Sequence, residues 1–90
     1  MVINKYLVEF LGTVFFLYVI LATGNALAIG AALALAIFVG GKISGGHFNP
    51  AVSLMMLAKG KLNTKDGMIY VLAQVLGGMT ALAIYKHVKL

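Results

Sequence analysis

Hydrophobic residues form three long runs along the chain, and short polar stretches separate them. The runs cover about residues 6–23, 26–41 and 67–85. A helix needs about 20 apolar residues to cross the hydrocarbon core of a bilayer, and each run comes close to that length. The pattern therefore predicts three transmembrane helices, with a tight connection at residues 24–25 between the first two.

The polar stretch between the second and third runs predicts a short fourth helix. Asn49 suits an N-cap because its side-chain oxygen can accept a free backbone N–H, and Pro50 suits the first helical position. A helix from Pro50 to about Lys59 would be roughly 15 Å long, about half the hydrocarbon thickness. Residues 43–59 are therefore predicted to be a re-entrant loop and half-helix. Such backbone is tolerated at membrane depth only where protein buries it or water bathes it, which indicates a pore.

The composition favours a membrane protein. The chain is 62% hydrophobic and 10% charged, and as a soluble protein it would expose large apolar patches. It has no cysteine, which rules out disulfides and thiolate metal sites. The net charge of +5 comes from seven lysines against Glu9 and Asp66. Because these lysines sit at the ends of the apolar runs, they are typical of membrane topology, and nucleic-acid binding is not predicted.

The lysines also predict the orientation of the chain, because positive charge is more frequent in cytoplasmic loops. The bias favours a multi-pass integral membrane protein with a cytoplasmic N-terminus. In that orientation Lys5, Lys42, Lys59, Lys61 and Lys65 lie on the cytoplasmic side, and Lys86 and Lys89 lie outside. A cleavable signal peptide is the alternative for the first run, but Glu9 within its apolar core and the further runs disfavour it.

Small residues recur every four positions in the second run, at Gly24, Ala28, Ala32, Ala36 and Gly40. Such a stripe lets a neighbouring membrane helix approach closely. An alanine-rich helix with no particular partner is the plainer interpretation.

The segment 44–52, Ser-Gly-Gly-His-Phe-Asn-Pro-Ala-Val, resembles the first Asn-Pro-Ala loop of the aquaporin and glycerol-facilitator (major intrinsic protein) family. Residues 9–13 (Glu-Phe-Leu-Gly-Thr) and 73–77 (Ala-Gln-Val-Leu-Gly) agree with it. The resemblance covers essentially all 90 residues, but only the N-terminal half of a family member. It implies an all-α membrane protein, in which residues 1–90 form one module of three transmembrane helices and a re-entrant half-helix, half of an aquaporin-like bundle.

Asn49, with Pro50 and Ala51, is the predicted pore site. Its amide can offer a hydrogen bond to a passing water or hydroxyl, and the half-helix N-terminus carries roughly half a positive charge. That field disfavours protons and cations in a narrow pore. The plainer interpretation is that Asn49 only caps its helix; the resemblance implies both roles.

Gly45, Gly46 and His47 are predicted to contribute backbone carbonyls along the channel wall, because the two glycines carry no side chain. His47 could be a pH-sensitive gate or be satisfied by local hydrogen bonds. A metal site is not predicted, because the second histidine, His87, lies far along the chain.

Glu9 is an ionisable residue within a predicted span, where function is the default interpretation. It could relay protons, or it could accept hydrogen bonds from backbone N–H groups of the re-entrant loop. The resemblance implies the second role, and Gln74 can do similar work from the third helix.

The selectivity filter differs from that of water channels. The family's second half carries an Arg after its Asn-Pro-Ala, whereas the matching position here is Val52 and the chain has no Arg. Ile29 is the filter candidate, at a position where water channels usually have an aromatic residue. Such a filter would be wider and more apolar, which favours small neutral solutes such as glycerol beside or instead of water.

One copy cannot enclose a pore, so the predicted channel needs a second half. The family's halves form an inverted repeat, and the partner would be an inverted copy or a different chain, within a higher oligomer in the lipid bilayer. The alternatives are a non-conducting fragment and a small membrane assembly or scaffold protein. No paired carboxylates, nucleophile–base set or phosphate-binding motif occurs, so neither enzyme activity nor a cofactor is predicted.

Overall fold

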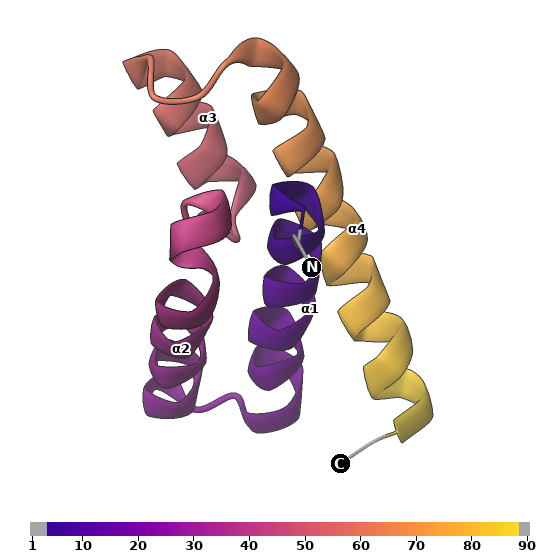
Figure 1. The fold of residues 1–90 in the computed structure, drawn as a ribbon. Coiled ribbons are helices and arrows are strands. Elements are labelled where there is room, and N and C mark those ends of the chain that lie inside the picture. The colour runs from indigo at the N-terminus through magenta and orange to yellow at the C-terminus, as the bar shows by residue number, and fades with distance from the viewer. Residues whose placement is uncertain (1–3, 89–90) are drawn as a thin grey trace.

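The computed structural model describes residues 4–88, which form four helices and, within that range, no strand. The helices are α1 (Lys5–Thr23), α2 (Ala26–Ser44), α3 (Pro50–Lys59) and α4 (Thr64–Val88) (Figure 1). α1, α2 and α4 are long and apolar enough to cross a membrane, whereas α3 has only 10 residues. The predicted fold class, three spanning helices plus one half-helix, is confirmed.

α1 lies at the centre of the bundle. It packs against α2 on one side and α4 on the other, while α3 packs against α4. In Figure 1, α2 and α3 follow one another along one side of the molecule, and the loop between them bends inward toward α1 and α4. Segments 26–39 residues apart in sequence therefore meet at this loop, which makes it the meeting point of all four helices.

Polar residues at the helix ends satisfy the backbone groups that a helix leaves free. Asn4, Asn25 and Asn49 cap α1, α2 and α3, each accepting a backbone N–H through its side chain. Gly24, Gly45 and Gly60 end the same helices in the left-handed conformation that glycine adopts readily.

The ends of the spanning helices differ from the approximate sequence-based bounds by at most three residues. α2 continues three residues beyond 41, because the first left-handed residue is Gly45 and not one of the preceding glycines. α4 starts at Thr64, and the side chain of the residue before it, Asn63, accepts the N–H of Asp66 at 2.8 Å. The apolar run of α4 is therefore preceded by a polar first turn that hydropathy alone does not assign to the helix.

The small-residue stripe of α2 faces α1. The buried residues of α2 are Ala32, Ala36, Gly40 and Ser44, spaced four apart. A Cβ added at Gly40 would lie 2.7 Å from Cγ1 of Val8 on α1. The two helices thus approach closely along this stripe, as small-residue packing in membranes requires.

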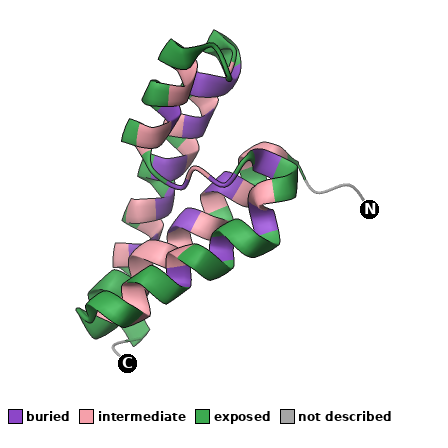
Figure 2. Ribbon diagram, turned by 90° about the vertical axis from the view of Figure 1, so that its left-hand side faces the viewer, coloured by how far each residue is buried: buried purple, intermediate pink, exposed green. Residues whose placement is uncertain are grey.

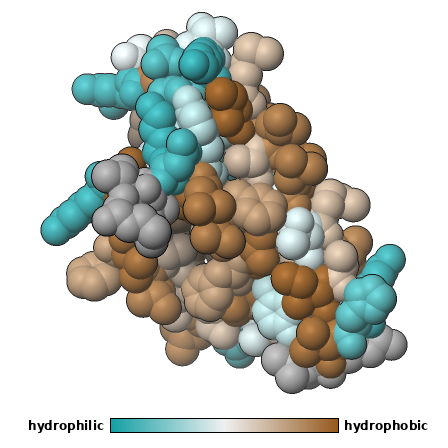
Figure 3. Space-filling model, turned by 45° about the vertical axis from the view of Figure 1, so that its right-hand side comes forward, coloured by the Kyte–Doolittle hydropathy of each residue, from teal (hydrophilic) through white to brown (hydrophobic). Residues whose placement is uncertain are grey.

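The interior of the chain holds many polar side chains, and its exterior is largely apolar. Buried positions lie where the helices face one another, while much of the outer surface is exposed (Figure 2). The buried polar side chains are those of Glu9, Thr13, Ser44, Ser53, Asp66 and Gln74, and most large aliphatic residues are exposed. Figure 3 shows hydrophobic side chains across the middle of one face and hydrophilic ones toward its ends. This distribution is the reverse of a soluble core and suits a lipid environment.

Candidate functional site

The loop between α2 and α3 turns sharply, and three of its residues have positive φ. Gly45 and Gly46 have φ of 95° and 68°, and Phe48 has φ of 53°. A Cβ at Gly46 would also lie 3.3 Å from Cα of Gly41, so the loop passes close to the end of α2. Phe48 is the one residue with a side chain that adopts this strained conformation within residues 4–88, which indicates that surrounding contacts hold it.

The carboxylate of Glu9 supplies the main polar contacts to the loop. Its Oε2 accepts the backbone N–H of His47 at 3.0 Å, and its Oε1 accepts that of Phe48 at 2.7 Å. Oε2 also accepts the Ser44 hydroxyl at 2.7 Å, and the Glu9 side chain is 0% exposed. A single side chain on α1 therefore satisfies two loop N–H groups that would otherwise be unpaired away from water.

Gln74 on α4 extends this network to α3. Its Nε2 donates to Glu9 Oε1 at 3.0 Å and to Ser53 Oγ at 2.8 Å. Ser53 Oγ also lies 2.8 Å from Nδ1 of His47, so the imidazole is satisfied locally. The network thus ties α1, α3, α4 and the loop together at one buried point.

The Phe48 ring fixes the loop from its apolar side. The side chain is 2% exposed, and a Cβ added at Gly12 of α1 would lie 2.1 Å from its Cε1. A Cβ at Gly40 of α2 would lie 3.4 Å from its Cζ. The ring therefore occupies space that exists because α1 carries glycine at position 12, and it is in ordinary contact distance of position 40 on α2.

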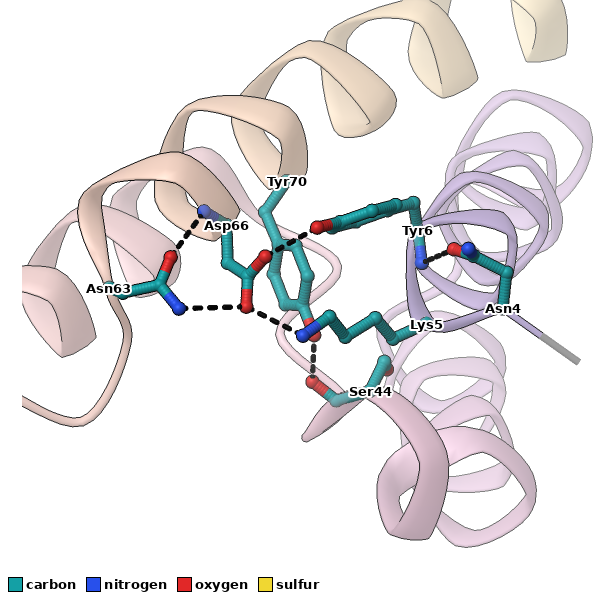
Figure 4. Close-up of polar contacts among 7 residues, drawn as sticks. All are labelled: Asn4, Lys5, Tyr6, Ser44, Asn63, Asp66 and Tyr70. Carbon is teal, nitrogen blue, oxygen red and sulfur yellow. Dashed lines mark hydrogen bonds and ion pairs between the residues drawn. The ribbon is translucent and has the colours of Figure 1, made fainter.

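Tyr70 anchors the start of the loop from α4. Its hydroxyl donates to the carbonyl oxygen of Ser44 at 2.5 Å, which satisfies one of the free carbonyls at the end of α2 (Figure 4). Its ring also lies edge-on to that of His47, with centroids 5.2 Å apart.

A second polar cluster joins the beginnings of α1 and α4 (Figure 4). Asp66 accepts hydrogen bonds from Lys5 Nζ at 2.6 Å and from the Tyr6 hydroxyl at 2.5 Å. Asn63 Nδ2 donates to the same carboxylate at 3.3 Å. The Tyr6 ring packs edge-on against Tyr70, with centroids 6.1 Å apart, so this cluster borders the residues that hold the loop.

We expect Asp66→Asn to weaken the α1–α4 contact without unfolding the chain. The amide keeps the size of the side chain but removes the charged partner of the half-exposed Lys5, and solvent screening keeps the resulting loss of stability small. Denaturation in mixed detergent micelles measures the free energy of unfolding, and Lys65→Gln, at an exposed neighbouring lysine, is the matched control. If Asp66→Asn lowered the free energy of unfolding no more than Lys65→Gln does, the expectation would be contradicted.

Asn49 lies exposed at the start of α3, next to a concave pocket. Its Oδ1 accepts the Ala51 N–H at 2.8 Å, so capping uses the oxygen and leaves the Nδ2 donor without a partner in residues 4–88. The pocket measures about 270 Å³ and is lined by α1, the end of the loop, the start of α3 and α4. Its lining residues are Thr13, Phe16, Leu17, Phe48, Asn49, Pro50, Gln74, Val75, Gly78 and Met79.

The other predicted site residues lie apart from this pocket. Gly45 is exposed, Gly46 is buried and His47 is half-buried, and none of the three lines it. Ile29 is half-buried near the start of α2, and Ala51 is exposed on α3. Sequence reasoning did not assign roles to Ser44, Phe48, Ser53 or Tyr70. Ser53 and Tyr70 each stand four positions from a predicted site residue, Asn49 and Gln74, and this one-turn spacing was an available signal.

Comparisons with known proteins agree with this architecture. The family model described as "Major intrinsic protein" matches residues 1–90. The chain is 45% identical over 92 residues to glycerol uptake facilitator protein-like 6 of Lactiplantibacillus plantarum, covering 92% of this chain and 43% of the relative. It is 41% identical over 97 residues to aquaporin Z of Brucella melitensis, covering 91% of this chain and 42% of the relative. No solved structure gives a significant match.

The fold and the loop together define a multi-pass integral membrane protein with a half-helix that follows a loop held by the bundle. The chain belongs to the major intrinsic protein family, which includes aquaporins and glycerol facilitators. It spans less than half the length of the first two relatives, 43% and 42%.

Proposed function

We propose that this chain forms one half of a passive transmembrane channel for water and small neutral solutes such as glycerol. The pore would be completed by a second half, either an inverted copy of this chain or a different chain, within a higher oligomer. The N-terminus would be cytoplasmic, as the lysine bias predicts. The names of the relatives, a glycerol uptake facilitator and an aquaporin, support this class of solute.

The observation that carries the proposal is the position of the Asn49 amide. It combines a free N–H donor, the positive end of α3 and a pocket with an apolar wall that includes Phe16 and Met79. Such a site offers a hydrogen bond to an uncharged molecule and repels cations. Support for the loop by Glu9 and Gln74 keeps the donor in place.

Ile29 would make the filter wider and more apolar than that of a water channel. Gly45, Gly46 and His47 would add carbonyl acceptors on the cytoplasmic side of the pore. Both assignments stay predictions, and both favour a pathway that admits a polyol as well as water.

The direct test is stopped-flow swelling of liposomes that contain only this chain. We expect the liposomes to be permeable to water and to glycerol, with no proton leak in a parallel pH-dye measurement. Permeation from the chain alone would support assembly from copies. Permeation only after addition of a complementary half would support a two-chain channel, and none in either case would contradict the proposal.

We expect Asn49→Ser to separate the two roles of this residue. Serine still caps α3 but carries no amide donor, so the helix persists while the pore loses one hydrogen bond. Permeability is expected to fall about tenfold, the equivalent of one bond of about 1.4 kcal/mol. Asn25→Ser, at the N-cap of α2 away from the pocket, is the matched control. Unchanged permeability with an unchanged oligomer would favour a scaffold protein over a channel.

A further inference from the structure

Two residues that line the pocket beside Asn49 each carry a polar atom without a partner. Among residues 4–88, Oε1 of Gln74 and Oγ1 of Thr13 are buried and make no hydrogen bond. Both side chains are 1% exposed and both residues line the pocket, Thr13 from α1 and Gln74 from α4. Buried polar atoms are nearly always paired with protein or with ordered water, so two orphans at one pocket need an explanation.

The orientation of the Gln74 amide follows from its neighbours. Nε2 donates to Glu9 Oε1 and Ser53 Oγ, which uses both of its hydrogens. If the amide were flipped, its oxygen would face the Glu9 carboxylate, and two acceptors cannot form a hydrogen bond with each other. Oε1 therefore keeps two free lone pairs on the side of the amide away from Glu9.

The Thr13 hydroxyl complements this acceptor, because it can donate one hydrogen bond and accept others. Thr13 lines the pocket from α1, whereas Gln74 lines it from α4. The pocket volume of about 270 Å³ is several times the roughly 30 Å³ that a water molecule occupies in the liquid. The pocket thus has room for an O–H group beside these two residues.

We propose that Thr13 and Gln74 form a hydroxyl-binding subsite across the pocket from Asn49. Gln74 Oε1 accepts a hydrogen bond from an O–H group, and the Thr13 hydroxyl bonds to the same group. The ligand is a resident water or the hydroxyl of a permeating polyol. The identity of the polyol rests on the proposed channel function, whereas the hydrated subsite stands on the two orphan atoms. Gln74 is then a contact residue as well as a support of the loop.

Solid-state NMR of the labelled full chain in liposomes tests the subsite without any transport measurement. Magnetisation transferred from water should reach the Gln74 side-chain amide, although the residue is buried. Thr13→Val removes only the hydroxyl at nearly constant volume and should reduce this transfer to the level of buried backbone amides. Thr13→Ser should restore it, and Thr80→Val, on α4 outside the pocket, should leave it unchanged.

Adding glycerol distinguishes the two sources of the O–H group. Cross-peaks from glycerol to Gln74 together with a loss of the water signal assign the subsite to the solute, and a persistent water signal assigns it to resident water. Absence of water and glycerol contacts in the wild type, or equal transfer in Thr13→Val, would overturn the subsite.

Swelling assays on the same liposomes keep this outcome apart from the channel proposal. Contacts at Gln74 without permeation, both from this chain alone and after addition of a complementary half, would refute the channel and keep the subsite. Permeation without water or glycerol contacts at Gln74 would support the channel and refute the subsite.

Discussion

Glu9→Ala is expected to release the loop from the bundle and to destabilise the folded chain by at least about 3 kcal/mol. The alanine removes an acceptor of four hydrogen bonds at a position with 0% exposure. The N–H groups of His47 and Phe48 then face the interior without a partner. Each unpaired donor costs about 1–3 kcal/mol, and water has little access to replace the bonds.

Hydrogen exchange of these two amides in liposomes measures the release. We expect both to exchange much faster in Glu9→Ala than in the wild type, and permeability to be lost. Glu9→Gln keeps the size of the side chain but turns one acceptor into a donor, so its effect should be intermediate. Protection of both amides in the alanine variant equal to that in the wild type would show that other contacts hold the loop.

Gly12→Ala is expected to destabilise the chain by about 2 kcal/mol or more, although it adds a single methyl group to a helix. The new Cβ would lie 2.1 Å from Cε1 of Phe48 and 2.7 Å from its Cδ1 and Cζ. The ring is 2% exposed, and the backbone of Phe48 is already in a left-handed conformation, so it has little room to yield. We therefore expect the ring to leave its site and the loop to shift with it.

Gly30→Ala provides the matched control in the same kind of helix. No atom lies within 4 Å of a Cβ added there, so the substitution should stabilise by up to about 1 kcal/mol through helix propensity. Denaturation in mixed detergent micelles measures the change in the free energy of unfolding for both glycine variants. In a Phe48→Ala background the effect of Gly12→Ala should be smaller, since the ring that would clash is absent. Equal effects of the two glycine substitutions would refute close packing of the ring against α1.

The cluster around Glu9 illustrates how far sequence reasoning reaches. A carboxylate within an apolar run needs partners, and the family resemblance directed attention to the loop. The sequence did not reveal that Ser44, Ser53 and Tyr70 share in these contacts. Serine and tyrosine are common at many places in membrane helices, and only the distances between them show which ones act together.

The local pattern of the chain determined the elements themselves. The three spanning helices follow from apolar runs long enough to cross a bilayer. The start of α3 at Asn49 and Pro50 follows from helix capping, which acts over a few residues. The tertiary structure decided the rest: the Phe48 ring against Gly12, the orphan oxygen of Gln74, and the free amide of Asn49. These features join residues that are up to 65 positions apart, and they depend on helix distances and angles that no short-range pattern encodes.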